Sequence, residues 1–246
     1  MNPPRFPYPG GKAMLAMTIV SFLPATGNTF ADVFAGRGNV YFAAASTLQY
    51  SNWVVNDIRT APFFESLKAV GNTVEVPERT RDNAYQTKND YRKYRNEDSH
   101  TARILEPFLT YSGAGYHTAG PRGAGGGPGA PYYRKVCSEA WSILNSTNTL
   151  ITSLDYLKVL ATLNNDDVAF VDPPYDGYDT NAYSDDDIDH RQLVEALQAA
   201  PYRWILSEYR NDLYVGAFGE PFWSKDVHRS CNPQGGRRVE FMWKNF

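Results

Sequence analysis

The 246-residue chain is poor in cysteine, since it has only Cys137 and Cys231, which show no C-x-x-C spacing. Two such residues indicate neither a disulfide framework nor a zinc site, and neither shows the pattern of a nucleophile. The chain lacks an apolar run long enough to cross a membrane, and its N-terminus lacks the charged-then-apolar pattern of a signal peptide. From these absences we expect a cytoplasmic protein that uses no metal and binds no membrane.

An excess of basic residues, typical of proteins that bind nucleic acids, is also missing, because the net charge is −3. The basic residues nevertheless gather in two groups, one at 79–95 and one near the C-terminus. Their members include Arg92, Lys93 and Arg95 in the first group, and Arg229, Arg237 and Arg238 in the second. A run of charges is usually a solvated surface, and acidic residues dilute the first group. We expect phosphate contacts from both groups, because they flank the half of the chain that carries the chemistry discussed below.

The chain has no complete phosphate-binding glycine motif. Residues 30–34 are typical of a short buried strand, residues 35–39 contain two glycines, and the apolar segment 40–45 suits a helix. Strand, glycine-rich turn and helix form the Rossmann-type arrangement, in which the backbone approaches a nucleotide cofactor. Because Tyr41 occupies the third glycine position of G-x-G-x-x-G, a dinucleotide pyrophosphate is not favoured. A cofactor without phosphates, such as S-adenosylmethionine, needs no such cradle, although two glycines after a strand can also form a plain turn.

The next predicted strand, residues 53–55, ends in Asn56 and Asp57. Asp57 thus follows the glycines by about 20 residues, the position at which Rossmann-like folds bind ribose hydroxyls. The same aspartate could equally cap the helix that we expect around residues 61–69, and the two roles are compatible.

Residues 8–12, Tyr-Pro-Gly-Gly-Lys, precede an apolar helical stretch that runs through Phe22. This segment is not a Walker loop, because Phe6 and Ala13 stand where that motif has a glycine and a serine or threonine. A site for a nucleotide triphosphate is therefore not indicated, and a plain turn before a helix is the simpler interpretation.

The tetrapeptide Asp172-Pro173-Pro174-Tyr175 follows the apolar run 168–171, which is typical of a buried strand. The prolines end the strand, so a carboxylate and an aromatic ring are expected at the carboxyl edge of the predicted α/β sheet, where such sheets bind ligands. This arrangement suits methyl transfer to an exocyclic amino group. Carboxylate and backbone carbonyl oxygens can accept the two N–H groups, and the ring can stack on the base. A strand-ending turn beside a surface tyrosine is the alternative.

Together these segments resemble Dam-like DNA adenine-N6 methyltransferases in order and spacing, over residues 5–76 and 150–246. The resemblance continues with a helix that begins at His190, a strand at 204–207, and a closing hairpin and final strand at 232–243. It implies an enzyme with an α/β fold, in which a Rossmann-like methyltransferase sheet uses S-adenosylmethionine to methylate double-stranded DNA.

The resemblance also implies roles for single residues. The catalytic set would be Asp172, Pro173, Pro174 and Tyr175, with Asp172 and the Pro173 carbonyl holding the target amine. The cofactor would be bound by Tyr8, Gly11, Lys12, Asp32, Phe34, Gly36, Gly38, Asp57, Asp155 and Asp172. Lys12 would lie near the methionine carboxylate and Asp155 near the adenine, although Asp155 could instead be a helix N-cap. Attack would be direct, with no covalent intermediate on the enzyme.

The resemblance is weak in the middle of the chain. We expect residues 1–76 and 150–246 to form the methyltransferase domain, and residues 77–149 to form a small helical insertion that helps to recognise DNA. Within it, residues 113–131 hold eight glycines and three prolines, which is typical of a long loop. The segments around 84–111 and 133–147 look helical. No base-reading residue can be assigned there.

We therefore predict site-specific transfer of a methyl group to the N6 of adenine in DNA, which requires the base to be flipped out of the duplex. Two alternatives keep the chemistry and change the acceptor, to adenine in RNA or to the exocyclic amine of cytosine. A third is a catalytically silent DNA-binding module, which the intact Asp172 and Tyr175 argue against. The sequence does not say whether a partner endonuclease makes this a restriction–modification system.

Overall fold

The computed structural model describes residues 2–76, 92–110, 113, 115, 130–175, 188–228 and 237–246. Several sequence predictions lie outside these ranges: those for Arg229, for hairpin residues 232–236, for most of the basic group at 79–95, and for most of the loop at 113–131. For Arg237 and Arg238 the described part is the backbone.

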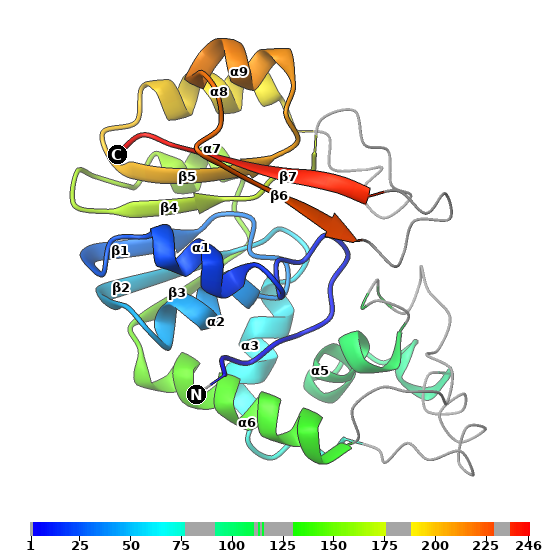
Figure 1. The fold of residues 1–246 in the computed structure, drawn as a ribbon. Helices are drawn as coiled ribbons and strands as arrows, with labels where there is room; N and C mark the ends of the chain where they lie inside the picture. The colour runs from blue at the N-terminus through cyan, green and yellow to red at the C-terminus, as the bar shows by residue number, and fades with distance from the viewer. Residues whose placement is uncertain are drawn as a thin grey trace.

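One sheet of seven strands forms the centre of the protein, in the order β3-β2-β1-β4-β5-β7-β6 (Figure 1). Its strands are β1 (Thr26–Asp32), β2 (Gln49–Asn56), β3 (Thr149–Thr152), β4 (Val168–Val171), β5 (Arg203–Glu208), β6 (Trp223–His228) and β7 (Arg237–Lys244). Strands β1 to β5 pair in parallel, whereas β7 pairs antiparallel with both β5 and β6. The start of this order, 3-2-1-4-5, is that of a Rossmann fold, so the predicted fold class is confirmed.

Helices connect and cover these strands. They are α1 (Ala16–Phe22), α2 (Asn39–Ala45), α3 (Ala61–Val70), α5 (His100–Leu109), α6 (Ala130–Ser146), α7 (Tyr156–Leu160), α8 (His190–Gln198) and α9 (Asp212–Phe218). The described part of the chain contains no helix that is both long and apolar enough to span a membrane.

Strand alternation divides the core into two layers. In β4, Val168 and Phe170 point into one cluster of buried side chains, while Ala169 and Val171 point into the other. The first cluster holds the apolar faces of α1, α2, α3, α5 and α6, and the second those of α7, α8 and α9. Because β4 is buried on both faces, its sequence is an unbroken apolar run, which is why it was recognisable.

The strand order reverses between β1 and β4. From β1 the chain proceeds outward to β2 and β3, and then returns to β4 on the other side of β1. In open α/β sheets, ligands bind at the carboxyl ends of the strands at such a switch point. Asp32, the last residue of β1, and Asp172, directly after β4, therefore belong to the edge where a ligand is expected.

The interval 77–149 contributes two described helices: α6 agrees with the prediction around 133–147, whereas α5 covers only residues 100–109 of the segment predicted around 84–111, and residues 95–99 are not helical. Both lie beside α3, at the end of the molecule opposite α8 and α9 (Figure 1). In α5, Leu105, Phe108 and Leu109 are buried in the same cluster as α2 and α3, so α5 shares the core of the sheet domain. That this interval recognises DNA stays a prediction.

The observed strands differ from the predicted ones where polar residues belong to a strand. The expected strand at 30–34 is β1, which starts at Thr26, because Thr26 to Thr29 are polar and partly exposed yet pair with β2. Strand β6 was not predicted, although the antiparallel pair β6–β7 extends the sheet beyond β5.

Candidate active site

Asp172 is held in place as soon as it leaves β4. Its Oδ1 lies 2.7 Å from Lys12 Nζ and accepts a hydrogen bond of 3.1 Å from the Tyr175 hydroxyl. Burial raises the pKa of the Asp172 carboxyl, and Glu240 raises it further, while Lys12 and the Tyr175 hydrogen bond lower it. The tetrapeptide thus presents a fixed carboxylate rather than a loose surface turn.

A buried charged group surrounds this carboxylate, here called the Lys12 cluster and formed by Lys12, Asp172, Tyr175, Ser207 and Glu240. Lys12 Nζ also lies 3.6 Å from Glu240 Oε2 and 4.8 Å from the centre of the Tyr175 ring. The Tyr175 hydroxyl also lies within hydrogen-bond distance of Glu240 Oε2, so its one proton is shared between the Asp172 and Glu240 carboxyl groups, and it lies 3.0 Å from Ser207 Oγ. Burial, Asp172 and Glu240 all raise the pKa of Tyr175, so this hydroxyl keeps its proton.

Sequence reasoning missed Glu240 and Ser207. Glu240 lies between Val239 and Phe241 in the final strand and is 2% exposed, although a glutamate inside an apolar strand is rarely buried without a partner. An acidic residue within an otherwise apolar strand was the available signal. Which residues face Glu240 depends on the pairing of β7 with β5, and this pairing is not visible in the sequence.

The glycine turn after β1 has the backbone that glycine permits. Gly36 and Gly38 have φ angles of 54° and 71°, and a Cβ on Gly36 would lie 2.7 Å from the Tyr8 ring. Tyr8 thus packs directly on this turn, and Gly11 N donates to Tyr8 O at 3.0 Å. Phe34, partly buried, packs against the ring of Tyr156.

Asp32 is the buried carboxyl of this turn. Its Oδ2 accepts a hydrogen bond of 3.1 Å from Tyr41 N, in the first turn of α2. Its Oδ1 is buried and has no hydrogen-bond partner among the described residues. Burial, followed by the charge of Asp172, raises the pKa of Asp32 to about 8. An unsatisfied buried carboxyl oxygen is costly, so this position suits a ligand that donates a hydrogen bond or brings positive charge.

Asp57 ties the turn to the loop after β2. Its Oδ2 accepts from Gly36 N at 2.9 Å, and its Oδ1 accepts from Arg59 N and Thr60 N at 2.9 and 2.8 Å. Thr60, rather than Asp57, occupies the N-cap position of α3. The Asp57 carboxylate therefore caps the turn of residues 57–60 that leads into α3, rather than the first turn of the helix itself. Asp57 retains lone pairs that could accept from a ribose.

Asp155 is the N-cap of α7, because its Oδ1 accepts from Leu157 N at 2.9 Å. This confirms the capping alternative. The aspartate is exposed and follows β3, at the same edge of the sheet as Asp57, so a contact with the cofactor adenine stays a prediction.

Arg37, between the two glycines, links the turn to α5. Its guanidinium is buried, pairs with Glu106 and lies 4.5 Å from the centre of the Phe63 ring. This contact was not predicted from the sequence. The available signal was a basic residue between two glycines, which needs a partner from another element when it is buried.

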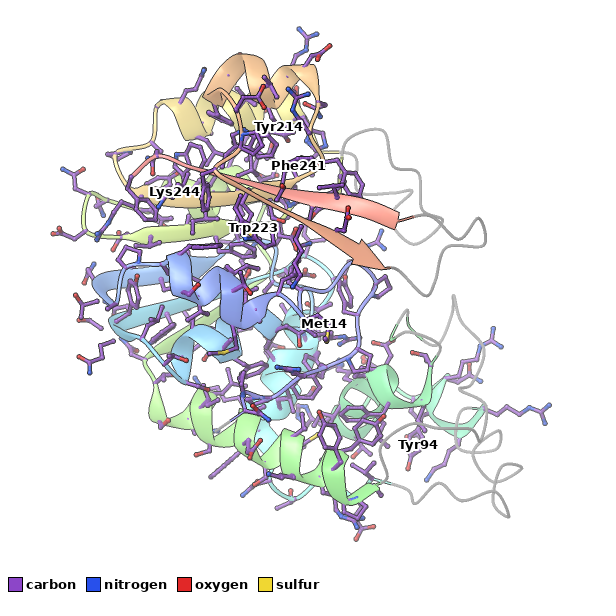
Figure 2. All side chains as sticks on the ribbon, in the orientation of Figure 1. Met14, Tyr94, Tyr214, Trp223, Phe241 and Lys244 are labelled. Atoms are coloured by element: carbon purple, nitrogen blue, oxygen red, sulfur yellow. The ribbon has the colours of Figure 1, made fainter. Side chains whose placement is uncertain are left out.

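The residues predicted to bind DNA are only partly described. Arg92, Lys93 and Arg95 are exposed in the segment before α5, where Tyr94 also lies (Figure 2). The backbones of Arg237 and Arg238 pair with His228 and Val227 in the β6–β7 ribbon. In the described ranges, no group of three or more histidine, cysteine or acidic side chains could hold a metal ion.

Comparison with known protein families decides the identity. The sequence model of the D12 class of N6 adenine-specific DNA methyltransferases matches residues 8–218, most of the chain. The chain belongs to this family. It is therefore an enzyme that methylates the N6 of adenine in DNA, and its methyl donor is S-adenosylmethionine. Comparison with curated proteins finds no match.

Solved structures resemble the D12-class chain only distantly. Precorrin 8W decarboxylase of Methanobacterium thermoautotrophicum is 12% identical, with 97% of this chain and 94% of that chain covered and a TM-score of 0.43. A Pyrococcus horikoshii protein described as an RNA methyltransferase is 9% identical, with 98% and 85% covered and a TM-score of 0.43. Trm5b of Pyrococcus abyssi is 10% identical, with 96% and 49% covered and a TM-score of 0.39.

The buried residues of the switch point fit S-adenosylmethionine. The methionine part of this molecule carries an ammonium group, which can satisfy the orphaned Oδ1 of Asp32. The ribose hydroxyls can donate to Asp57, and the positive φ angles at Gly36 and Gly38 let the backbone turn closely beneath a ligand. The D12-class family and the local chemistry thus agree on the cofactor.

Proposed function

We propose that the edge of the sheet formed by Asp172, Pro173 and Tyr175 binds the target adenine of a DNA duplex. The observation that carries this assignment is the fixed carboxylate of Asp172, which lies at the switch point among buried charged groups. Adenine N6 is a poor nucleophile because its lone pair is delocalised into the ring. Acceptors for both of its N–H groups, Asp172 and the Pro173 carbonyl, help to localise that pair on the nitrogen.

Asp172 can hold the amine while it stays paired with Lys12. In this structure Asp172 Oδ1 already accepts from Lys12 and Tyr175, and an oxygen of this kind accepts about two hydrogen bonds, so we assign the amine to the second oxygen, Oδ2. Lys12 Nζ also lies 3.6 Å from Glu240 Oε2, so the one ammonium pairs with both buried carboxylates.

The transferred methyl group is supplied by S-adenosylmethionine. Asp32 and Asp57 would hold its ammonium and ribose groups, with Tyr8, Gly36 and Gly38 shaping the turn beneath it. After the new N–C bond forms, the nitrogen must lose a proton. Asp172 is placed to accept it, because burial raises the pKa of this carboxyl.

The duplex would be held by phosphate contacts and the target base flipped out of the stack. Arg92, Lys93 and Arg95 are exposed and available for phosphates, and the sequence of the C-terminal group favours the same role for Arg229, Arg237 and Arg238. We place the protein in the cytoplasm because the D12-class family acts on DNA. The interval 77–149 is our candidate for recognition of sequence, since its helices α5 and α6 pack on α3 and Glu106 of α5 pairs with Arg37 of the glycine turn.

The test is methylation by the purified protein with radiolabelled S-adenosylmethionine and duplex DNA, followed by digestion and identification of the modified nucleoside. We expect N6-methyladenine within one short sequence context. Label on N4 of cytosine, or higher activity on RNA of the same sequence than on the duplex, would contradict the proposal. Asp172→Asn serves as the inactive control, because it keeps the shape of the side chain and removes its charge.

A further inference from the structure

The backbone of the glycine turn after β1 is tied to the loop that follows β2. Gly36 N donates to Asp57 Oδ2 at 2.9 Å, and the Thr60 hydroxyl donates to Gly36 O. Gly38 N closes the turn on itself by donating to Ala35 O at 2.7 Å. Both backbone groups of Gly36 are thus fixed by the loop that carries Asp57, the candidate acceptor for the ribose.

The side chain of Arg37, between the two glycines, contacts two helices instead. Its guanidinium lies 4.5 Å from the centre of the Phe63 ring in α3 and forms an ion pair with Glu106 of α5. Helices α3 and α5 lie side by side (Figure 1). Since Arg37 is only 4% exposed, its charge is held in place by these helices rather than by water. The turn is therefore braced against α5 at the residue next to Gly36.

Arg37 and Asp57 are linked through Gly36. One oxygen of the Asp57 carboxylate accepts from the amide of Gly36, the residue directly before Arg37. In the proposed function the same carboxylate accepts from the ribose hydroxyls, so its orientation determines the strength of that contact. A turn released from α5 would let Gly36 move, and Asp57 would lose the donor that orients it. Binding groups need such support to stay in their productive geometry.

We propose that Arg37 is a positioning residue for the cofactor. Its ion pair with Glu106 keeps the glycine turn, and through Gly36 the Asp57 carboxylate, in the orientation that binds the ribose. This role rests on the proposed function, in which Asp57 holds the ribose of S-adenosylmethionine. Helix α5 thereby supports the cofactor site, in addition to belonging to the interval that we expect to recognise DNA.

The test measures the binding of S-adenosylhomocysteine by calorimetry without DNA, beside its 2′,3′-dideoxy analogue, which lacks both ribose hydroxyls. Arg37→Met removes the charge and keeps an unbranched side chain against Phe63. We expect this variant to bind S-adenosylhomocysteine about fivefold more weakly, because a hydrogen bond to a charged group is loosened. Binding of the dideoxy analogue should change less than about twofold, since that ligand makes no ribose contact to lose.

Three further variants isolate the ion pair. Glu106→Gln keeps the size of the side chain and should repeat the effect of Arg37→Met. The double variant should bind no more weakly than Arg37→Met alone, because both substitutions remove the same interaction. Arg103→Met is the matched control, since Arg103 pairs with the exposed Asp98 at the start of the same helix. It should leave both affinities unchanged.

Circular dichroism and thermal unfolding check that each protein is folded at the temperature of the calorimetry. Glu106 is a quarter exposed, so Glu106→Gln carries the test if Arg37→Met does not fold. Equal loss of affinity for both ligands in the folded variants, or no loss for either ligand, would overturn the proposal.

Asp57→Ala separates this role from the proposed function. It should remove the preference of the wild-type protein for S-adenosylhomocysteine over the dideoxy analogue. If the preference survives in Asp57→Ala, the ribose binds elsewhere, and both the placement of the cofactor and the role of Arg37 are rejected. If Asp57→Ala removes the preference while Arg37→Met and Glu106→Gln leave it intact, the placement of the cofactor stands and only the role of Arg37 is rejected.

Discussion

At the scale of single residues, Lys12 connects the two halves of the chain. It comes from the segment before α1, yet its ammonium lies between Asp172, after β4, and Glu240, in β7. A buried carboxylate is stable only if it is paired, so each of these contacts also positions its partner. In the proposed function, Asp172 would thereby meet the target amine in a fixed orientation, which is where an electrostatic contribution to catalysis is largest.

We predict that Asp172→Ala abolishes most turnover. A positioned electrostatic contact commonly contributes 10²–10³-fold, or about 3–4 kcal/mol of transition-state stabilisation. Single-turnover methylation of duplex DNA measures the loss, and circular dichroism checks the fold. Turnover within about threefold of wild type would show that another group holds the amine.

Asp32 gives a prediction for pH dependence. Its pKa in the folded protein is raised to about 8, above its ordinary value of 3.8, so the folded state keeps a proton that the unfolded state releases between these values. The stability contributed by protonated Asp32 is therefore fully present below about pH 4 and is lost as the pH rises through about 8. Asp32→Asn, which stays neutral, should gain thermal stability relative to wild type as the pH is raised from 5 to 8.

Thermal unfolding of both proteins without cofactor, at several pH values, checks this expectation. The same variant should bind S-adenosylmethionine more weakly, because the orphaned Oδ1 is replaced. A difference in unfolding temperature that does not change with pH would mean that Asp32 is ionised in the folded protein.

At the scale of elements, much of the site follows from strand ends. The apolar run at 168–171 and the prolines after it predicted β4 and Asp172 correctly, because a strand buried on both faces has a plain signature. The turn with Gly36 and Gly38 was likewise recognisable, since both need positive φ angles. The contact between Lys12 and Glu240 was not recognisable, because Glu240 reaches Lys12 only through the pairing of β7 with β5.

Arg37 and Glu106 join two elements, and a prediction follows for their stability. Arg37 is buried between the glycines of the turn, while Glu106 belongs to α5 and is a quarter exposed. Removing one partner of a fully buried ion pair costs about 3–5 kcal/mol of stability, because the other charge is left uncompensated. Since water reaches part of the Glu106 side chain, we expect a smaller cost of about 1–3 kcal/mol here. Arg37→Met should therefore lower the free energy of unfolding by about 1–3 kcal/mol.

Denaturant unfolding of Arg37→Met, Glu106→Gln and the double variant measures the coupling between the two side chains. The matched control is the exposed pair of Asp98 and Arg103, at the start of the same helix. Asp98→Asn should have little effect, since exposed pairs contribute little. Additive effects of Arg37→Met and Glu106→Gln would show that the pair does not hold α5 to the glycine turn.

At the scale of the whole molecule, the distribution of charge matters more than its sum. The protein is slightly acidic, with 27 acidic and 24 basic residues, so the field of the whole molecule does not favour DNA. Binding must then depend on local groups. Arg92 and Lys93 are exposed beside Tyr94 at the α5 end of the molecule (Figure 2). Arg237 and Arg238 begin β7, at the same edge of the sheet as the end of β5.

If these groups contact phosphates, DNA binding should weaken steeply with salt, with a logarithmic slope of about −0.9 per phosphate neutralised. Replacing Arg92 and Lys93 together by glutamine, or Arg237 and Arg238 together, should make the slope shallower by up to about 2 and weaken binding to any sequence. The control pair is Arg203 and Lys244, at the start of β5 and the end of β7, on the edge of the sheet away from the site. Fluorescence anisotropy at several salt concentrations measures all three slopes. If both double variants show the same salt slope as the control variant, the DNA binds on another face of the molecule.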